Sequence, residues 1–183
     1  MANLDTLHSQ PLTLIQPATQ ALARGGSIAA WRQAMETAIR RSQTAAMIAG
    51  VADRDFGGNV RALLSKIIGV RAIAKADRAQ LESRIAAQLK YLDGFASDLR
   101  DGKLTMPQAE ARANLYAGPT RATFYAARYP GLPFYPGEGS ECKMNCKCSW
   151  DQHGDQFSWT LHADEHCPTC VTRAGGNPYT ASA

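Results

Sequence analysis

The sequence lacks the features that mark several familiar classes of protein. No run of about eighteen or more apolar residues occurs, so we expect no membrane-spanning segment. A His-Glu-x-x-His motif, a serine nucleophile turn and a glycine-rich phosphate loop are missing, as is the His-x-Glu motif of zinc deaminases. The sequence therefore predicts a protein without enzymatic activity and without a membrane partner.

Positive charge is scarce at the C-terminal end. Residues 137–183 hold 3 Lys/Arg against 6 Asp/Glu, a net charge of −3, whereas residues 1–136 hold 17 against 10, a net charge of +7. Binding to nucleic acid depends on Lys and Arg side chains that neutralise phosphates. The acidic C-terminal part is therefore not expected to read DNA, and the basic N-terminal part is expected to make at most a weak contact with it.

Cysteine is absent from the first 141 residues, and all five cysteines follow as Cys-x₃-Cys-x-Cys and Cys-Pro-Thr-Cys. Thiolates so close in sequence can bind one ion, because a tight turn directs both sulfurs into one small volume. Two such pairs complete the sulfur-rich tetrahedron that Zn²⁺ prefers. We expect a structural zinc ion with the ligands Cys146, Cys148, Cys167 and Cys170. Cys142 is the alternative ligand, since five thiols exceed four positions, and His166 is a weaker candidate.

Two other chemistries of the cysteines stay open. Two disulfides with one free thiol would use the same residues, and so would an iron–sulfur or redox role. Disulfides belong to oxidising compartments, and the first eight residues lack the charged start and apolar core of a signal peptide. Zinc is therefore the interpretation that the sequence favours.

The residues between the two cysteine groups alternate apolar and polar side chains. The alternation runs through residues 148–152 and 156–162, on either side of His153-Gly154-Asp155. A period of two about a glycine-containing turn predicts a β-hairpin. Such a hairpin would carry one group of thiols before its first strand and the other after its second strand, as in a zinc ribbon.

Residues 1–128 show helical periodicity and no convincing strand. Ser27 can cap a helix whose apolar residues recur at three- and four-residue steps through Trp31, Met35 and Ile39. Residues 60–73 predict a shorter helix, and a last helical piece ends near residue 129.

Two capping boxes mark the remaining helices. In the first, Asp77 is followed three residues later by Gln80, and an apolar stripe continues at helical spacing as far as Leu99. In the second, Thr105 is followed by Gln108. Both segments are therefore predicted to be helices that begin at these boxes.

The predicted architecture is mainly α, with a small zinc-ribbon-like β-hairpin module at the C-terminal end. Three prolines and three glycines among the twelve residues 129–140 interrupt the helical pattern and indicate a semi-rigid connector. The expected division is a helical domain at 1–128, a connector at 129–140 and a cysteine-rich zinc-binding module at 141–183.

Several C-terminal motifs together resemble a known family. They are Pro136-Gly137-Glu-Gly139-Ser140, Asn145-Cys146-Lys-Cys148, Cys167-Pro-Thr-Cys170 and Asn177-Pro-Tyr179. This stretch is similar to the C-terminal region of minor head or head-morphogenesis proteins of tailed bacteriophages, in which an Asn-Cys-x-Cys element is paired with a Cys-x-x-Cys element.

The resemblance implies a structural virion protein that performs no catalysis. Its implied partners are phage portal, capsid or scaffold proteins, and its implied location is the virion, with the host bacterial cytoplasm during assembly. The alternative is a nucleic-acid-binding or regulatory zinc-ribbon protein, in which the basic helical part contacts DNA and the acidic module contacts a protein.

Overall fold

The chain folds into a helical part and a small C-terminal sheet, which confirms the expected fold class. This is a computed structural model, and it describes residues 11–59, 74–116, 119–132, 135–136, 141, 146–162 and 165–181. The helix expected at 60–73 lies outside the described residues. None of the described helices is both long enough and apolar enough to cross a membrane.

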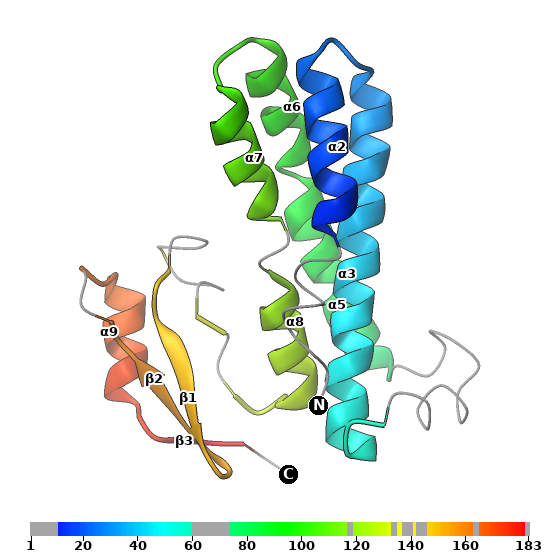
Figure 1. Cartoon of the computed structure of the whole chain (residues 1–183). Coiled ribbons are helices and arrows are strands. Elements are labelled where there is room, and N and C mark those ends of the chain that lie inside the picture. Colours follow the sequence, from blue (N-terminus) through cyan, green and yellow to red (C-terminus); the bar gives the residue numbers. More distant parts are fainter. Residues whose placement is uncertain are drawn as a thin grey trace.

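The helical part is organised around one long helix, α3 (Ile28–Phe56). Beside its first half lie α2 (Leu12–Ala23) and α6 (Leu92–Arg100), and α7 (Met106–Asn114) packs against α2. Beside its second half lie α5 (Lys75–Leu89) and α8 (Pro119–Arg128) (Figure 1). Helix α2, which contains Pro17 within its span, was not among the helices expected from the sequence.

The stripe predicted for α3 is buried as expected. Trp31, Met35 and Ile39 are buried, and the Ser27 side chain accepts a hydrogen bond from the Ala30 N–H at 3.4 Å. The helix ends at Gly57, whose φ of +57° is the left-handed conformation that glycine adopts without steric cost. Capping and burial together therefore define both ends and the inner face of this helix.

The second predicted helix differs from the expectation in two ways. It begins at Lys75, so Asp77 lies inside the first turn, where its carboxylate is buried and pairs with Arg54 at 3.3 Å. The chain also breaks at Lys90 and Tyr91 into α5 and α6. Before the break α5 contacts α3 and α8, and after it α6 contacts α2 and α3. The other capping box is confirmed at Thr105, whose N–H donates to the Gln108 side chain at 2.9 Å.

The predicted hairpin is confirmed. Strands β1 (Ser149–His153) and β2 (Gln156–Thr160) pair antiparallel around Gly154, whose φ is +66°. The short strand β3 (Tyr179–Thr180) pairs with β2, and α9 (Pro168–Gly175) packs against the same strand.

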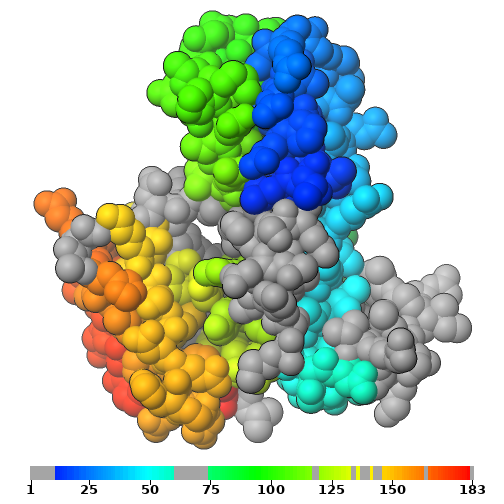
Figure 2. Space-filling model, viewed as in Figure 1, coloured from blue at the N-terminus to red at the C-terminus, as the bar shows by residue number. Residues whose placement is uncertain are grey.

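The small sheet lies beside α8, at the end of the molecule away from α6 and α7 (Figure 2). Trp150, Phe157 and Trp159 form a buried cluster with Cys170, and Tyr125, Tyr129, Leu132 and Tyr135 pack against this cluster. The Tyr129 ring meets the Phe157 ring edge-on, with centroids 4.6 Å apart. We call these buried residues, together with the side chains that pack against them, the aromatic cluster. It contains residues from all three of the expected segments.

Candidate metal centre

Three thiols meet at one end of the small sheet. Cys146 and Cys148 lie just before β1, and Cys170 lies in the first turn of α9, after β2. The hairpin reverses the chain, and α9 then packs back against β2, so cysteines distant in sequence come together. This is the arrangement that the alternating sequence pattern predicts.

The distances between these thiols are short enough for one metal ion. The sulfurs of Cys146 and Cys170 are 3.6 Å apart, and the sulfurs of Cys146, Cys148 and Cys170 all lie within 4.8 Å of one another. A disulfide would place two sulfurs about 2.05 Å apart, and none of the four described cysteines is in a disulfide. The three thiols could therefore hold a metal ion.

The surroundings of the group are largely apolar. Cys170 is fully buried, while Cys146 and Cys148 are half-buried. All three belong to the aromatic cluster or pack against it. A metal ion here would be shielded from water on the side of Cys170, because Phe157 and Trp159 of that cluster are themselves buried.

The other predicted ligands have different positions. Cys167 is not part of the three-thiol group; it precedes α9, where its carbonyl accepts the Cys170 N–H at 3.0 Å. Its neighbour His166 places Nδ1 3.8 Å from the Cys148 sulfur. Cys142 lies outside the described residues. Three of the five expected thiols, those of Cys146, Cys148 and Cys170, are therefore together.

An asparagine fixes the strand beside the site. The Trp159 N–H donates to Asn177 Oδ1 at 2.6 Å, and Asn177 Nδ2 donates to the Trp159 carbonyl at 2.9 Å. This pair of hydrogen bonds extends the pairing of β2 to the residue Asn177, before β3 begins. Tyr179 adds a hydrogen bond from its hydroxyl to the Arg173 carbonyl at 2.6 Å. The Asn-Pro-Tyr motif was visible in the sequence, but its role as a clamp on β2 needed the structure.

Two phenols of the aromatic cluster are held in the neutral form. Burial raises the pKa of Tyr125 and of Tyr135 above the ordinary value, with smaller contributions from neighbouring groups. Both hydroxyls therefore stay protonated at physiological pH. The rings of Tyr125 and Tyr135 therefore act as apolar packing in the cluster.

Comparisons of the chain with protein-family models, with curated proteins and with solved structures found no significant match.

Proposed function

We propose that the three-thiol group binds a structural zinc ion, with a fourth ligand supplied by His166 or Cys167. The donor chemistry supports this, because three thiolates and one further sulfur or imidazole nitrogen form a tetrahedral set typical of structural zinc. Soft thiolate ligands also disfavour Mg²⁺ and Ca²⁺, which prefer oxygen. The observation that carries the proposal is the meeting of Cys146, Cys148 and Cys170 at the end of the hairpin.

The spacing of the donor atoms also fits zinc. Sulfur and nitrogen ligands at their usual distances from one tetrahedral ion lie about 3.6–3.8 Å apart. The Cys146 and Cys170 sulfurs are 3.6 Å apart, and Cys148 Sγ is 3.8 Å from His166 Nδ1. Neither a His166 ring nitrogen nor the Cys167 sulfur lies within 4.8 Å of all three sulfurs. The three sulfurs therefore define three corners of the site, and binding of the ion would draw His166 or Cys167 into the fourth.

Such an ion would hold the module together and would catalyse nothing. Four protein ligands leave no open position for water or substrate, which a catalytic zinc requires. The small sheet has few buried side chains of its own, and structural zinc supplies on the order of 10 kcal/mol to small modules. The proposed role is therefore to fix the ends of the hairpin and the start of α9.

We further propose that the protein is a structural component of a tailed-phage particle, of the minor head or head-morphogenesis type. The support is that the two cysteine motifs that resemble this family contribute thiols to one site. The partners would be portal, capsid or scaffold proteins. The protein would be made in the bacterial cytoplasm and built into the virion.

The nucleic-acid-binding alternative has weaker support. Some of the positive charge on the helical part is already neutralised by ion pairs. Arg40 pairs with Glu36 at 2.8 Å and with Glu82 at 3.3 Å, and Arg54 pairs with Asp77 at 3.3 Å. Salt-dependent binding to duplex DNA would be the result that favours this alternative.

Zinc content tests the metal proposal. Protein purified without added metal should contain about one zinc ion per chain, and Cys170→Ser should abolish this. One of the two variants His166→Ala and Cys167→Ser should also lose zinc, and the one that does identifies the fourth ligand. His153→Ala is the matched control, because the exposed His153 pairs with Gln156 beside the turn, at the end of the hairpin away from the thiols. Zinc lost from Cys167→Ser but kept in His166→Ala would make Cys167 the fourth ligand, and wild-type protein without zinc would refute the proposal.

Mass spectrometry of purified particles tests the virion assignment. The protein should be found in particles from the phage or prophage that encodes it, at a constant ratio to the capsid protein. Its absence from particles and from assembly intermediates would refute the assignment and leave the metal proposal standing.

A further inference from the structure

The three thiols of the metal centre differ in their access to solvent. Cys170 is fully buried in the first turn of α9, whereas Cys146 and Cys148 are half-buried. Cys146 and Cys148 also lie in the stretch before β1, outside any helix or strand. A small oxidant in the solvent, such as hydrogen peroxide, can therefore reach Cys146 and Cys148 but not Cys170.

Metal binding would hold these thiols in their reactive form. A thiol that coordinates a metal ion loses its proton. Thiolate is also the form of cysteine that peroxides oxidise, and exposure to solvent increases its susceptibility. The half-buried sulfurs at this site would therefore be both charged and accessible.

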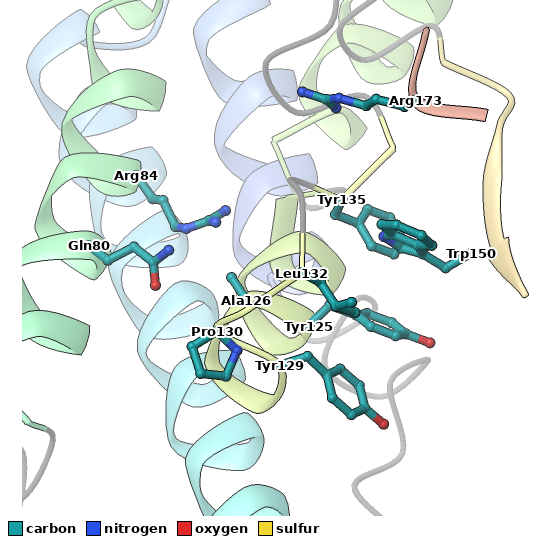
Figure 3. Close-up of a pocket in the computed structure, with 10 residues that line it drawn as sticks. All are labelled: Gln80, Arg84, Tyr125, Ala126, Tyr129, Pro130, Leu132, Tyr135, Trp150 and Arg173. Carbon is teal, nitrogen blue, oxygen red and sulfur yellow. The ribbon is translucent and has the colours of Figure 1, made fainter. Parts of the chain in front are cut away.

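The position of Cys170 is fixed by its surroundings. Its N–H donates to the Cys167 carbonyl at 3.0 Å, and its side chain is one of the buried members of the aromatic cluster. The rings of this cluster pack on one another, and the ring centres of Tyr125 and Tyr135 are 5.0 Å apart (Figure 3). A sulfur that bonds to Cys170 must therefore move toward it, and the irregular stretch before β1 supplies that freedom.

Cys146 is the thiol best placed to bond to Cys170. The two sulfurs are 3.6 Å apart, so they need to approach by about 1.5 Å to reach the length of a disulfide. The Cys148 sulfur instead has Nδ1 of His166 3.8 Å away. The accessible Cys146 and the anchored Cys170 thus form a pair of an attacked thiol and a resolving thiol.

The reaction consumes two thiolates and one peroxide. The Cys146 sulfur attacks a peroxide oxygen, so that an S–O bond forms, the O–O bond breaks and hydroxide leaves. The Cys170 sulfur then attacks the resulting sulfenic acid, so that the S–S bond forms, the S–O bond breaks and a second hydroxide leaves. Both hydroxides take up protons as water. The two sulfurs lose two electrons, and the peroxide gains them.

We propose that the three-thiol group is a peroxide-sensitive switch in which a disulfide between Cys146 and Cys170 replaces the metal ion. The inference rests on the proposed zinc site and adds its regulation. Oxidation removes two of the four ligands, so the ion leaves. The disulfide joins the start of β1 to α9, which are the segments that the ion would hold, so the hairpin stays closed after the ion is lost.

The test treats the full chain, with its zinc content measured beforehand, with hydrogen peroxide in the presence of a zinc indicator. The product is then digested without reduction, and the linked peptides are identified by mass spectrometry. Trypsin and a glutamate-specific protease place Cys142, Cys146 and Cys148 on separate peptides, and fragmentation at Pro168 distinguishes Cys170 from the preceding cysteine.

Peroxide should release the zinc and link residue 146 to residue 170, and dithiothreitol with added zinc should restore the starting form. The oxidised protein should melt at a higher temperature than reduced protein in chelator, and chelator should no longer change its melting temperature. The variant Cys142→Ser keeps all three thiols of the group and should behave as the wild type. Cys146→Ser should form no disulfide with Cys170.

Three results would overturn the proposal for a chain that contains zinc. The first is zinc retained after oxidation, and the second is zinc release with Cys146 linked to Cys142 or Cys148 instead of Cys170. The third is an oxidised protein that melts no higher than the reduced protein in chelator. Each of these results leaves the zinc site standing, whereas a chain purified without zinc overturns the proposed function and the switch together.

Discussion

The contact between α3 and α8 gives the sharpest prediction, because it depends on a single missing methyl group. Gly50 lies on α3 where α8 crosses it. A Cβ at this position would lie 2.5 Å from the Phe124 carbonyl oxygen and 2.7 Å from the Ala127 Cβ. Ordinary van der Waals contact begins at 3.4 Å, so the Gly50→Ala variant would force α8 outward by most of an ångström.

The magnitude follows from what the new methyl group meets. Overpacking of a well-packed interior costs about 1–3 kcal/mol, and here the obstacle is a backbone carbonyl that cannot change rotamer. We expect this overpacking to cost about 2–3 kcal/mol. Alanine in place of glycine gains a helix about 1 kcal/mol, so Gly50→Ala should lower the free energy of unfolding by about 1–2 kcal/mol net.

A second glycine supplies the control. Gly94 is also helical, in α6, and a Cβ there would meet nothing within 4 Å. The variant Gly94→Ala should therefore raise the free energy of unfolding by about 0.5–1 kcal/mol. Urea titrations followed by circular dichroism, with zinc held constant, measure both changes. Equal effects of the two substitutions, or a neutral Gly50→Ala, would refute the close approach of α3 and α8.

Three further predictions concern the metal centre, the asparagine clamp and pH. A chelator should lower the melting temperature of the wild-type protein and leave that of Cys170→Ser unchanged in thermal melts. An equal effect of the chelator on both proteins would contradict this prediction. Asn177→Ala removes both hydrogen bonds to the Trp159 backbone. It should lower the free energy of unfolding, measured by urea titration, by about 1–2 kcal/mol, since each bond contributes roughly 1 kcal/mol. An unchanged free energy would mean that water replaces these hydrogen bonds. The Arg112 side chain lowers the pKa of Asp98 in the folded state by hydrogen bonding, so the stabilisation by this pair is present above about pH 4 and is lost as the pH falls through the lowered pKa. The melting temperature of Asp98→Asn should therefore lie below that of the wild type at pH 7, and the difference should shrink in acid. A difference that stays constant across pH would contradict this linkage.

The hairpin and the α3 helix were predictable because their signals are local. Alternation about Gly154 specifies strand, turn and strand within a dozen residues, and the spacing of Trp31, Met35 and Ile39 specifies one buried helical face. The break at Lys90 was not predictable in this way. The apolar residues on either side of it keep helical spacing, so the pattern alone reads as one helix.

The position of Asp77 shows a second limit of local patterns. Its side chain can accept hydrogen bonds from the start of a helix, and Gln80 follows at the spacing of a capping box. In the fold the Asp77 carboxylate instead forms an ion pair with Arg54, which lies on the earlier helix α3. Contacts between distant segments decide such cases.

For the metal centre, the sequence indicated the chemistry better than the choice of ligands. Clustered cysteines point to a metal whatever the detailed path of the chain. The choice between His166 and Cys167 depends instead on how the chain enters α9. Cys167 directly precedes that helix, and its carbonyl accepts two of the first N–H groups of α9, from Cys170 and Val171. The side chains of His166 and Cys167 therefore differ in their access to the three-thiol group, although the two residues are adjacent in the chain.

The thiols and the aromatic cluster form one structural unit. A three-stranded sheet this small buries too little surface to be stable alone. Cys170 is one of the buried residues of the cluster, and the Tyr129 ring, just after α8, contacts the Phe157 ring of the sheet. A metal ion at the thiols would therefore fix the position of the cluster, and with it the contact to α8. Loss of the ion should therefore loosen the hairpin and also weaken the contact between Phe157 and Tyr129, because the side chains of the aromatic cluster take part in both.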